Sequence, residues 1–257
     1  MYDPYYFAPL AAVEDRHFWF RARNRAIAAV VESLVADLPD GYRVLEAGCG
    51  TGNVLRVLDQ ACRRGVVAGM DLHAEGLVFA RGRTRRPLVR ADMAAPPFRP
   101  GFDLIGMFDV LEHLDDDRRA LGDLHALLAP GGRLLLTVPA HPALWSYFDE
   151  ESGHRRRYRA AELREKLAAA GYRVEYFTPY MAAILPLMWI GRRVASLLDR
   201  RSSRERAARD LRVTPVVNEV LSGMLQLEAG RIRRLAPLPF GASYLAVAAK
   251  AASISTR

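Results

Sequence analysis

Short apolar runs alternate with segments of helical periodicity along the first 180 residues. Runs of a few apolar residues bounded by Gly, Pro or Asp predict buried strands, and apolar positions at spacings of three and four predict amphipathic helices. The predicted strands are the start of the 42–53 segment and residues 66–70, 88–91, 102–108, 133–139, 172–178 and 241–250. The predicted helices between them are residues 24–38, 53–64, 75–83, 116–128 and 160–170. Such alternation predicts an α/β fold with a parallel sheet.

The first strand leads into a glycine turn, in the segment YRVLEAGCGTGN that begins at Tyr42. Glu46 is followed by Gly48, Gly50 and Gly52, and then by a helix. Glycines permit positive φ and close approach of a ligand to the backbone, and a helix start offers free N–H groups. A tight turn without a ligand would use glycines in the same way.

Carboxylates follow the next two strands. Asp71 lies about 20 residues beyond the glycine turn, where nucleotide-binding α/β folds place an acid on ribose hydroxyls. Asp92 and Met93 follow the third strand. Capping of a helix or turn is the structural alternative for each acid. The dinucleotide fingerprint G-x-G-x-x-G would require glycine where Asn53 stands.

The pattern E-x-G-x-G-x-G resembles the first motif of the class I S-adenosylmethionine-dependent methyltransferases. The phrases GMDLH, RADMAAPPF, DVLEHL and L-x-P-G-G-x-L-L-L-x-V-P resemble later motifs of that family, and the resemblance covers residues 14–180 and the last strand. It implies a Rossmann-like seven-stranded sheet that ends in a reversed hairpin. It also implies one domain: a cap (1–38), a core (39–178 and 238–251) and a helical lid insert (179–237).

The resemblance implies a cofactor site for S-adenosylmethionine. EDRHFWFRARNRAI looks like the N-terminal cap of a bacterial subgroup, in which an aromatic lid and an arginine lie against the cofactor. A docking helix with an aromatic staple is the alternative. The cofactor-binding residues expected by resemblance are Trp19, Arg23, Glu46, Gly48, Gly50, Gly52, Asp71, Leu72, Asp92, Met93 and Phe108.

The segment AHPALWSYFDEESGHRRRY, residues 140–158, resembles the acceptor-side loop of the same subgroup. Arginines there could hold a carboxylate or phosphate, and an imidazole could remove a proton. The predicted catalytic residues are His113, His141 and His154, and the predicted acceptor-binding residues are Trp145, Tyr147, Arg155, Arg156 and Tyr158. A structural histidine at position 113 and a solvated basic loop are the alternatives. The spacing of His, Cys and acids predicts no metal site.

The net charge of +8 is carried by arginine, because Lys166 and Lys250 are the only lysines. The basic residues are spread over many segments and no RNA-binding signature is present, so nucleic acid is not expected as a partner. Two cysteines give no disulfide framework, and no signal peptide or run of ~18 apolar residues is found. These features predict a cytoplasmic protein. The apolar segment 184–190, followed by Arg192 and Arg193, leaves peripheral membrane contact open.

Methyl transfer to a small-molecule or metabolite acceptor is the favoured function, with oxygen as the first choice because histidines cluster near the site. Anionic, glycan, lipid-linked and peptide acceptors stay open. Two alternatives come from other classes: a nicotinamide-dependent oxidoreductase, and a non-catalytic membrane-surface or nucleic-acid adaptor on the same fold.

Overall fold

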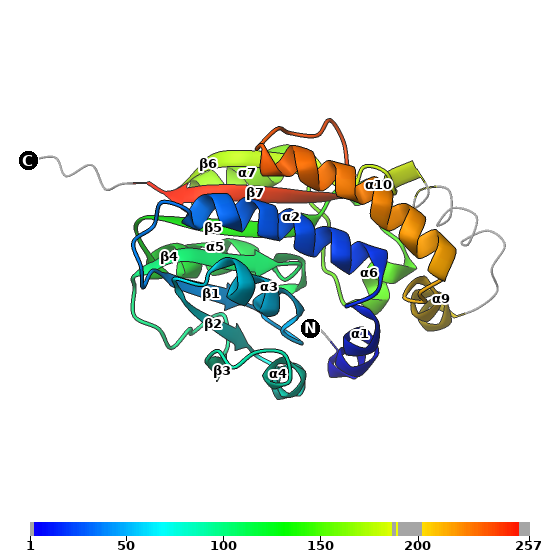
Figure 1. The fold of residues 1–257 in the computed structure, drawn as a ribbon, viewed down its shortest axis with the longest axis horizontal. Coiled ribbons are helices and arrows are strands. Elements are labelled where there is room, and N and C mark those ends of the chain that lie inside the picture. Colours follow the sequence, from blue (N-terminus) through cyan, green and yellow to red (C-terminus); the bar gives the residue numbers. More distant parts are fainter. Residues whose placement is uncertain (1–2, 187–188, 190–201, 252–257) are drawn as a thin grey trace, which may run out of the picture.

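The computed structural model describes residues 3–186, 189 and 202–251. A seven-stranded sheet forms the centre of the molecule, with strand order β3-β2-β1-β4-β5-β7-β6 (Figure 1). The strands are β1 (Arg43–Ala47), β2 (Val66–Asp71), β3 (Leu88–Arg90), β4 (Phe102–Phe108), β5 (Leu128–Pro139), β6 (Tyr172–Tyr180) and β7 (Ser243–Lys250). All seven predicted strands are confirmed.

Strands β1 to β5 run parallel, and β7 is antiparallel to both of its neighbours, β5 and β6. The sheet therefore contains the reversed hairpin of β6 and β7 that the resemblance implied. Because the strands from β1 to β5 share a direction, their carboxyl ends meet at one edge of the sheet, which is where open α/β sheets bind ligands.

Helices cover both faces of the sheet (Figure 1). The helices are α1 (Phe7–Val13), α2 (Phe18–Val35), α3 (Asn53–Ala61), α4 (Ala74–Arg81), α5 (Asp117–Leu127), α6 (Tyr147–Glu151), α7 (Ala160–Ala169), α9 (Ser203–Asp210) and α10 (Pro215–Arg233). Short 3₁₀ turns lie at η1 (Pro4–Tyr6), η2 (Leu111–His113) and η3 (Pro142–Leu144). Helices α2, α3 and α10 pack on one face, and α5 and α7 on the other.

Alternation along the strands builds these two cores. In β1, Val44 joins the cluster beneath α2, α3 and α10, whereas Leu45 joins the cluster with α5 and α7. Successive side chains of a strand point to opposite faces, so a strand buried on both faces is apolar throughout. This explains why the strands were visible as continuous apolar runs rather than as alternating patterns.

Two local expectations about helices need correction. The helix predicted over residues 24–38 begins earlier, since α2 starts at Phe18, where His17 caps it by accepting the Trp19 N–H at Nδ1. The 140–158 segment was expected to be a loop, but it contains α6. Ser146 and Asp149 form a capping box there. The Ser146 hydroxyl oxygen accepts the backbone N–H of Asp149, and the Asp149 carboxylate accepts the backbone N–H of Ser146.

Part of the predicted lid insert lies outside the described residues, including residues 187, 188 and 190 of the 184–190 segment that was considered for membrane contact. The described part contains α9 and α10. Helix α10 packs along α2, where Arg21 forms an ion pair with Glu219, and Asn218 accepts the Phe18 N–H at 2.7 Å. Of the helices that the structure describes, none is long and apolar enough to cross a bilayer.

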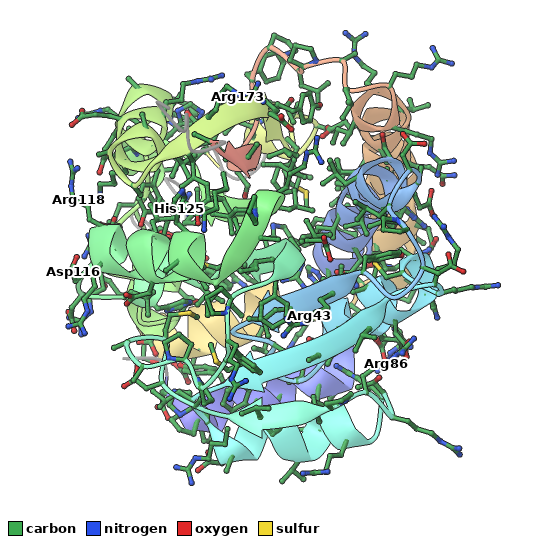
Figure 2. All side chains as sticks on the ribbon, turned by 90° about the vertical axis from the view of Figure 1, so that its left-hand side faces the viewer. Arg43, Arg86, Asp116, Arg118, His125 and Arg173 are labelled. Atoms are coloured by element: carbon green, nitrogen blue, oxygen red, sulfur yellow. The ribbon has the colours of Figure 1, made fainter. Side chains whose placement is uncertain are left out.

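The basic residues are distributed around the molecule. Figure 2 shows Arg86, Arg118 and Arg173 on different sides. Each forms an ion pair with an acid: Arg86 with Asp59, Arg118 with Glu165 and Arg173 with Glu175. The expectation that nucleic acid is not a partner stays a prediction.

Candidate active site

A cleft of about 840 Å³ lies at the carboxyl edge of the sheet. This volume is within the usual range for small-molecule and cofactor sites. The ends of β1, β2, β4 and β5 form its floor, and residues of α1, α2, α6 and α9 form its walls. The following predicted site residues line it: Trp19, Arg23, Glu46, Gly48, Gly50, Asp71, Leu72, Asp92, Met93, Phe108, His113, Tyr147, His154 and Arg155.

The glycine turn forms one end of the cleft. All three glycines have positive φ, at 81° for Gly48, 50° for Gly50 and 76° for Gly52. A Cβ on Gly50 would meet only the Phe7 ring, at 3.6 Å. This backbone therefore faces open space in the cleft, as close approach of a ligand requires.

Gly52 does not line the cleft, although it was expected to bind the cofactor. A Cβ at this position would lie 2.9 Å from the Cα of Ala80. The glycine thus allows α4 to pack tightly against the turn, and its role in this structure is packing.

Asp71 fastens the glycine turn to the end of β2. Its Oδ2 accepts the Gly50 N–H at 2.7 Å, and its Oδ1 accepts the His73 N–H at 2.8 Å. Burial raises the pKa of this carboxyl, and the two backbone hydrogen bonds oppose the shift. Each oxygen keeps a second lone pair, so the carboxylate can accept further hydrogen bonds from a ligand.

Glu46 lies deeper in the same end of the cleft and is 2% exposed. Its Oε2 has no hydrogen-bond partner among the described residues. Burial raises the pKa of Glu46 well above its usual value, with the charge of Arg23 opposing the shift. A buried carboxylate oxygen without a donor is unfavourable, so this oxygen is suited to a donor that arrives with a ligand.

Arg23 lines the cleft but already has partners. Its guanidinium forms an ion pair with Asp109 at 3.0 Å and donates to Asn53 at 3.1 Å. It also lies over the Trp19 ring, with 5.3 Å between the guanidinium carbon and the ring centroid. The structure therefore places Arg23 as a link between the N-terminal cap and the end of β4.

The cap is tied to the glycine turn by buried polar contacts that sequence reasoning missed. Glu14 accepts the Thr51 hydroxyl at 2.6 Å and forms an ion pair with Arg83. In the sequence, these contacts are marked only by the acidic pair Glu14 and Asp15 before the aromatic segment HFWF. The spacing of this pair does not predict that Glu14 contacts Thr51 and Arg83. Phe7, from α1, lies against the turn and the His73 ring.

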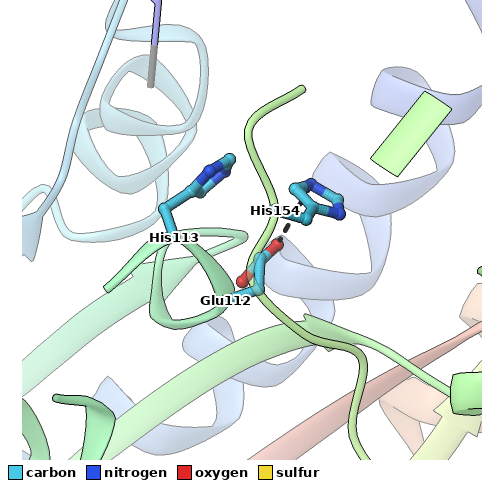
Figure 3. A group of neighbouring side chains, drawn as sticks. All are labelled: Glu112, His113 and His154. Atoms are coloured by element: carbon cyan, nitrogen blue, oxygen red, sulfur yellow. Dashed lines mark ion pairs between the residues drawn. The ribbon is translucent and has the colours of Figure 1, made fainter. Parts of the chain in front are cut away.

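The other end of the cleft is formed by residues after β4 and around α6. Glu112, His113 and His154 meet there, and the two imidazole rings have centroids 4.8 Å apart (Figure 3). Burial, with a smaller effect of His154, lowers the pKa of His113 to about 3. His113 is thus neutral at physiological pH and a weak base.

Asp149 holds His154 in place. Its Oδ1 lies 2.9 Å from Nδ1 of His154 and 2.7 Å from Nε of Arg157. Burial alone would raise the pKa of Asp149, but the His154 hydrogen bond and the Arg157 charge outweigh it and bring the pKa to about 2. The three side chains form a buried network beneath the cleft wall.

Several predicted acceptor-side residues lie elsewhere. Tyr158 is fully buried and donates to Asp117 at 2.9 Å, so the prediction that it binds an acceptor is wrong. His141, Trp145 and Arg156 do not line the cleft. Arg156 instead forms an ion pair with Asp117, at 3.1 Å.

A family model described as a methyltransferase domain matches residues 19–176, which is more than half of the chain. The chain belongs to the class I S-adenosylmethionine-dependent methyltransferase family. The methyltransferase match includes the glycine turn, Asp71, and the segment of Glu112, His113 and His154. It leaves α10 and β7 outside.

Two curated relatives are similar over a large part of the sequence. A probable S-adenosylmethionine-dependent methyltransferase of Mycolicibacterium smegmatis is 31% identical over 170 residues, 65% of this chain and 63% of that protein. The malonyl-[acyl-carrier protein] O-methyltransferase of Enterobacter lignolyticus is 31% identical over 168 residues, 61% of this chain and 65% of that protein. The matched segments thus span less than two thirds of each relative.

Among solved structures, the methyltransferase in a complex with the Haloferax volcanii Trm112 methyltransferase activator has the same fold. The TM-score is 0.59 at 21% sequence identity, and the match covers 95% of this chain and 97% of that chain. Methyltransferase family membership counts against the nicotinamide-dependent alternative. The non-catalytic adaptor alternative has the same fold, so an assay of methyl transfer is needed to distinguish it from an enzyme.

Proposed function

We propose that this chain transfers a methyl group from S-adenosylmethionine to an oxygen atom of a small-molecule acceptor. The observation that carries the proposal is one cleft with two chemically different ends. One end presents the glycine turn, Asp71 and Glu46, and the other presents Glu112, His113 and His154. A two-substrate reaction requires such an arrangement.

The cofactor end fits the chemistry of S-adenosylmethionine. Asp71 would accept hydrogen bonds from the two ribose hydroxyls, and the unpaired Oε2 of Glu46 would accept one from the ammonium group. Asp92 and Met93 line the part of the cleft next to β3, which suits the adenine. Trp19 and Phe7 would cover this end and exclude water.

When bound, the cofactor supplies a methyl group on a positively charged sulfur that leaves readily. The chain itself has to align the acceptor oxygen with that methyl group and keep water out. The acceptor oxygen forms the new bond to carbon, the sulfur keeps the electrons of the broken bond, and a hydroxyl acceptor also loses its proton. His113 and His154 line the same cleft and would lie near that proton.

Oxygen as the acceptor atom is supported by the imidazoles in the cleft and by the name of the Enterobacter relative, an O-methyltransferase. An anionic acceptor has weaker support, because Arg155 forms an ion pair with Asp115 and Arg157 with Asp149. The part of the 179–237 insert that lines the cleft, including Asp210 and Leu221, would act as a lid over the acceptor.

A methyl-transfer assay tests the proposal directly. Purified protein, S-adenosylmethionine with a labelled methyl group, and a panel of hydroxyl, carboxylate and amine compounds are incubated together. We expect label in hydroxyl or carboxylate products, and treatment with mild alkali distinguishes esters, which release the label, from ethers. Label found in amines alone would overturn the oxygen assignment. No transfer to any acceptor, despite cofactor binding, would favour the adaptor alternative.

A further inference from the structure

Three potential metal ligands converge at the acceptor end of the cleft. Glu112 and His113 belong to η2, directly after β4, and His154 follows α6 (Figure 3). One donor atom from each side chain lies within 4.8 Å of the other two. This group could not be predicted from the sequence, because His154 lies far along the chain from the adjacent pair Glu112 and His113.

Glu112 is the unusual member of the group. It is fully buried, and neither carboxylate oxygen has a hydrogen-bond partner among the described residues. The nearest basic atom across the gap is Nε2 of His154, 3.9 Å from Oε1. Buried carboxylates in proteins are paired, hydrogen-bonded or bound to metal. Among the described residues, Oε2 of Glu112 therefore has no donor or cation, and Oε1 has only the long contact with His154.

Both imidazoles are oriented as metal-binding histidines are. Nδ1 of His154 lies 2.9 Å from the Asp149 carboxylate, and Nδ1 of His113 lies 3.3 Å from the Gly153 carbonyl oxygen. Because both partners only accept, each Nδ1 carries a proton, and in the neutral ring Nε2 then carries the lone pair. A carboxylate or carbonyl behind the ring is the usual means of fixing the tautomer of a ligating histidine.

The backbone also supports this geometry. Asp109, which starts the turn that carries Glu112 and His113, has a φ of 54°. Such a conformation is costly for a residue other than glycine and persists only where the surroundings enforce it. Here the Asp109 N–H donates to the Thr137 carbonyl, and its carboxylate accepts the Thr137 hydroxyl and the Arg23 guanidinium.

We propose that Glu112, His113 and His154 bind one divalent transition-metal ion of the zinc class. Two imidazoles and one carboxylate are the ligands of known zinc sites with an open position, and of related iron sites. Metal–ligand bonds of about 2.0–2.2 Å would draw the three donor atoms closer than their present spacing. All three residues line the cleft, so the open positions of the ion would face the acceptor.

The ion would give the acceptor end its chemistry, a role that rests on the proposed methyl transfer. A hydroxyl or carboxylate oxygen is a suitable ligand for the open position. A divalent cation lowers the pKa of a bound hydroxyl, so that the proton passes to solvent and the oxygen becomes the nucleophile.

Cobalt titration tests the site. Untagged protein, stripped with a chelator and dialysed, is titrated with Co²⁺ while heat and visible absorption are recorded. We expect one Co²⁺ per chain, with a visible band from imidazole ligands, and at least about tenfold weaker binding in Glu112→Gln and in His154→Ala. His141→Asn, a histidine change outside the cleft, should bind Co²⁺ as the wild type does.

The affinity of each variant for S-adenosylhomocysteine shows whether it is folded. The proposed metal site would be overturned if the wild type bound no Co²⁺. It would also be overturned if the folded variants Glu112→Gln and His154→Ala bound Co²⁺ as tightly as the wild type. Cofactor binding and methyl transfer that persist without metal would overturn the acceptor role of the ion but leave the proposed function standing. If instead the proposed function is wrong, the wild-type protein will show no cofactor binding or no methyl transfer, whichever metal is added.

Discussion

Replacement of Arg157 by methionine is expected to lower the free energy of unfolding by about 3–5 kcal/mol, the usual cost of removing one partner of a buried ion pair. The side chains of Arg157 and Asp149 are 4% and 0% exposed. Without the guanidinium, Asp149 keeps its contacts with His154 and the α6 cap, but its negative charge is left buried without a permanent cation. Urea denaturation followed by circular dichroism measures the loss.

The neighbouring residue provides a matched control. Arg155 pairs with Asp115 at the surface, where the two side chains are 41% and 81% exposed. Surface ion pairs contribute about 0–1 kcal/mol, so Arg155→Met should change stability little. Equal losses in the two variants would contradict the buried network.

The pH dependence of this effect has a defined sign. The pKa of Asp149 is about 2 in the folded chain, below its ordinary value of 3.8. The resulting stabilisation is fully present above the unfolded pKa and is lost as pH falls from about 4 to 2. The stability difference between wild type and Arg157→Met should therefore be constant near neutral pH and shrink over that acidic range.

Asp71→Asn is expected to weaken binding of S-adenosylhomocysteine by about 10- to 150-fold, which corresponds to roughly 1.5–3 kcal/mol for hydrogen bonds to a charged group. An amide of the same shape has one acceptor oxygen in place of two. It cannot accept the backbone N–H groups of both Gly50 and His73, and it offers less to ribose hydroxyls. Isothermal titration calorimetry gives the affinity.

Asp40→Asn is the control for loss of one negative charge. Asp40 forms a surface ion pair with Arg64 and does not line the cleft. Its variant should bind S-adenosylhomocysteine as the wild type does. An Asp71→Asn protein with unchanged affinity would remove Asp71 from the cofactor site.

The fold was predictable because its signals are local. The central strands β1, β4, β5 and β7 contain short apolar runs, and burial on both faces makes these runs continuous. The start of α2 was missed because a histidine rather than Ser, Thr, Asp or Asn caps it. The α6 helix was missed because it is only one turn long and its capping box stands in a polar, aromatic segment.

The end of the cleft at the glycine turn was also largely predictable, since β1 and β2 carry Glu46 and Asp71 near their carboxyl ends and Asp92 follows β3. Gly52 was not predictable in the same way, because the sequence does not distinguish a glycine required for packing against α4 from a glycine that faces a ligand.

The acceptor end depended on contacts between distant segments. Tyr158 carries a polar group in a basic stretch, yet it is buried against Asp117. In the segment DVLEHL, His113 was predicted as a site residue but Glu112 was not. His154 lies beside both residues only in the folded chain. The pairing of Arg155, Arg156 and Arg157 with acids could not be read from their adjacency in sequence.

The most direct test of the account is a calorimetric titration of the purified protein with S-adenosylhomocysteine, with NADH titrated in parallel. The structure predicts one S-adenosylhomocysteine bound per chain in the cleft formed by the glycine turn, Glu46 and Asp71, and no binding of NADH. Binding of NADH alone, or of neither compound, would contradict it.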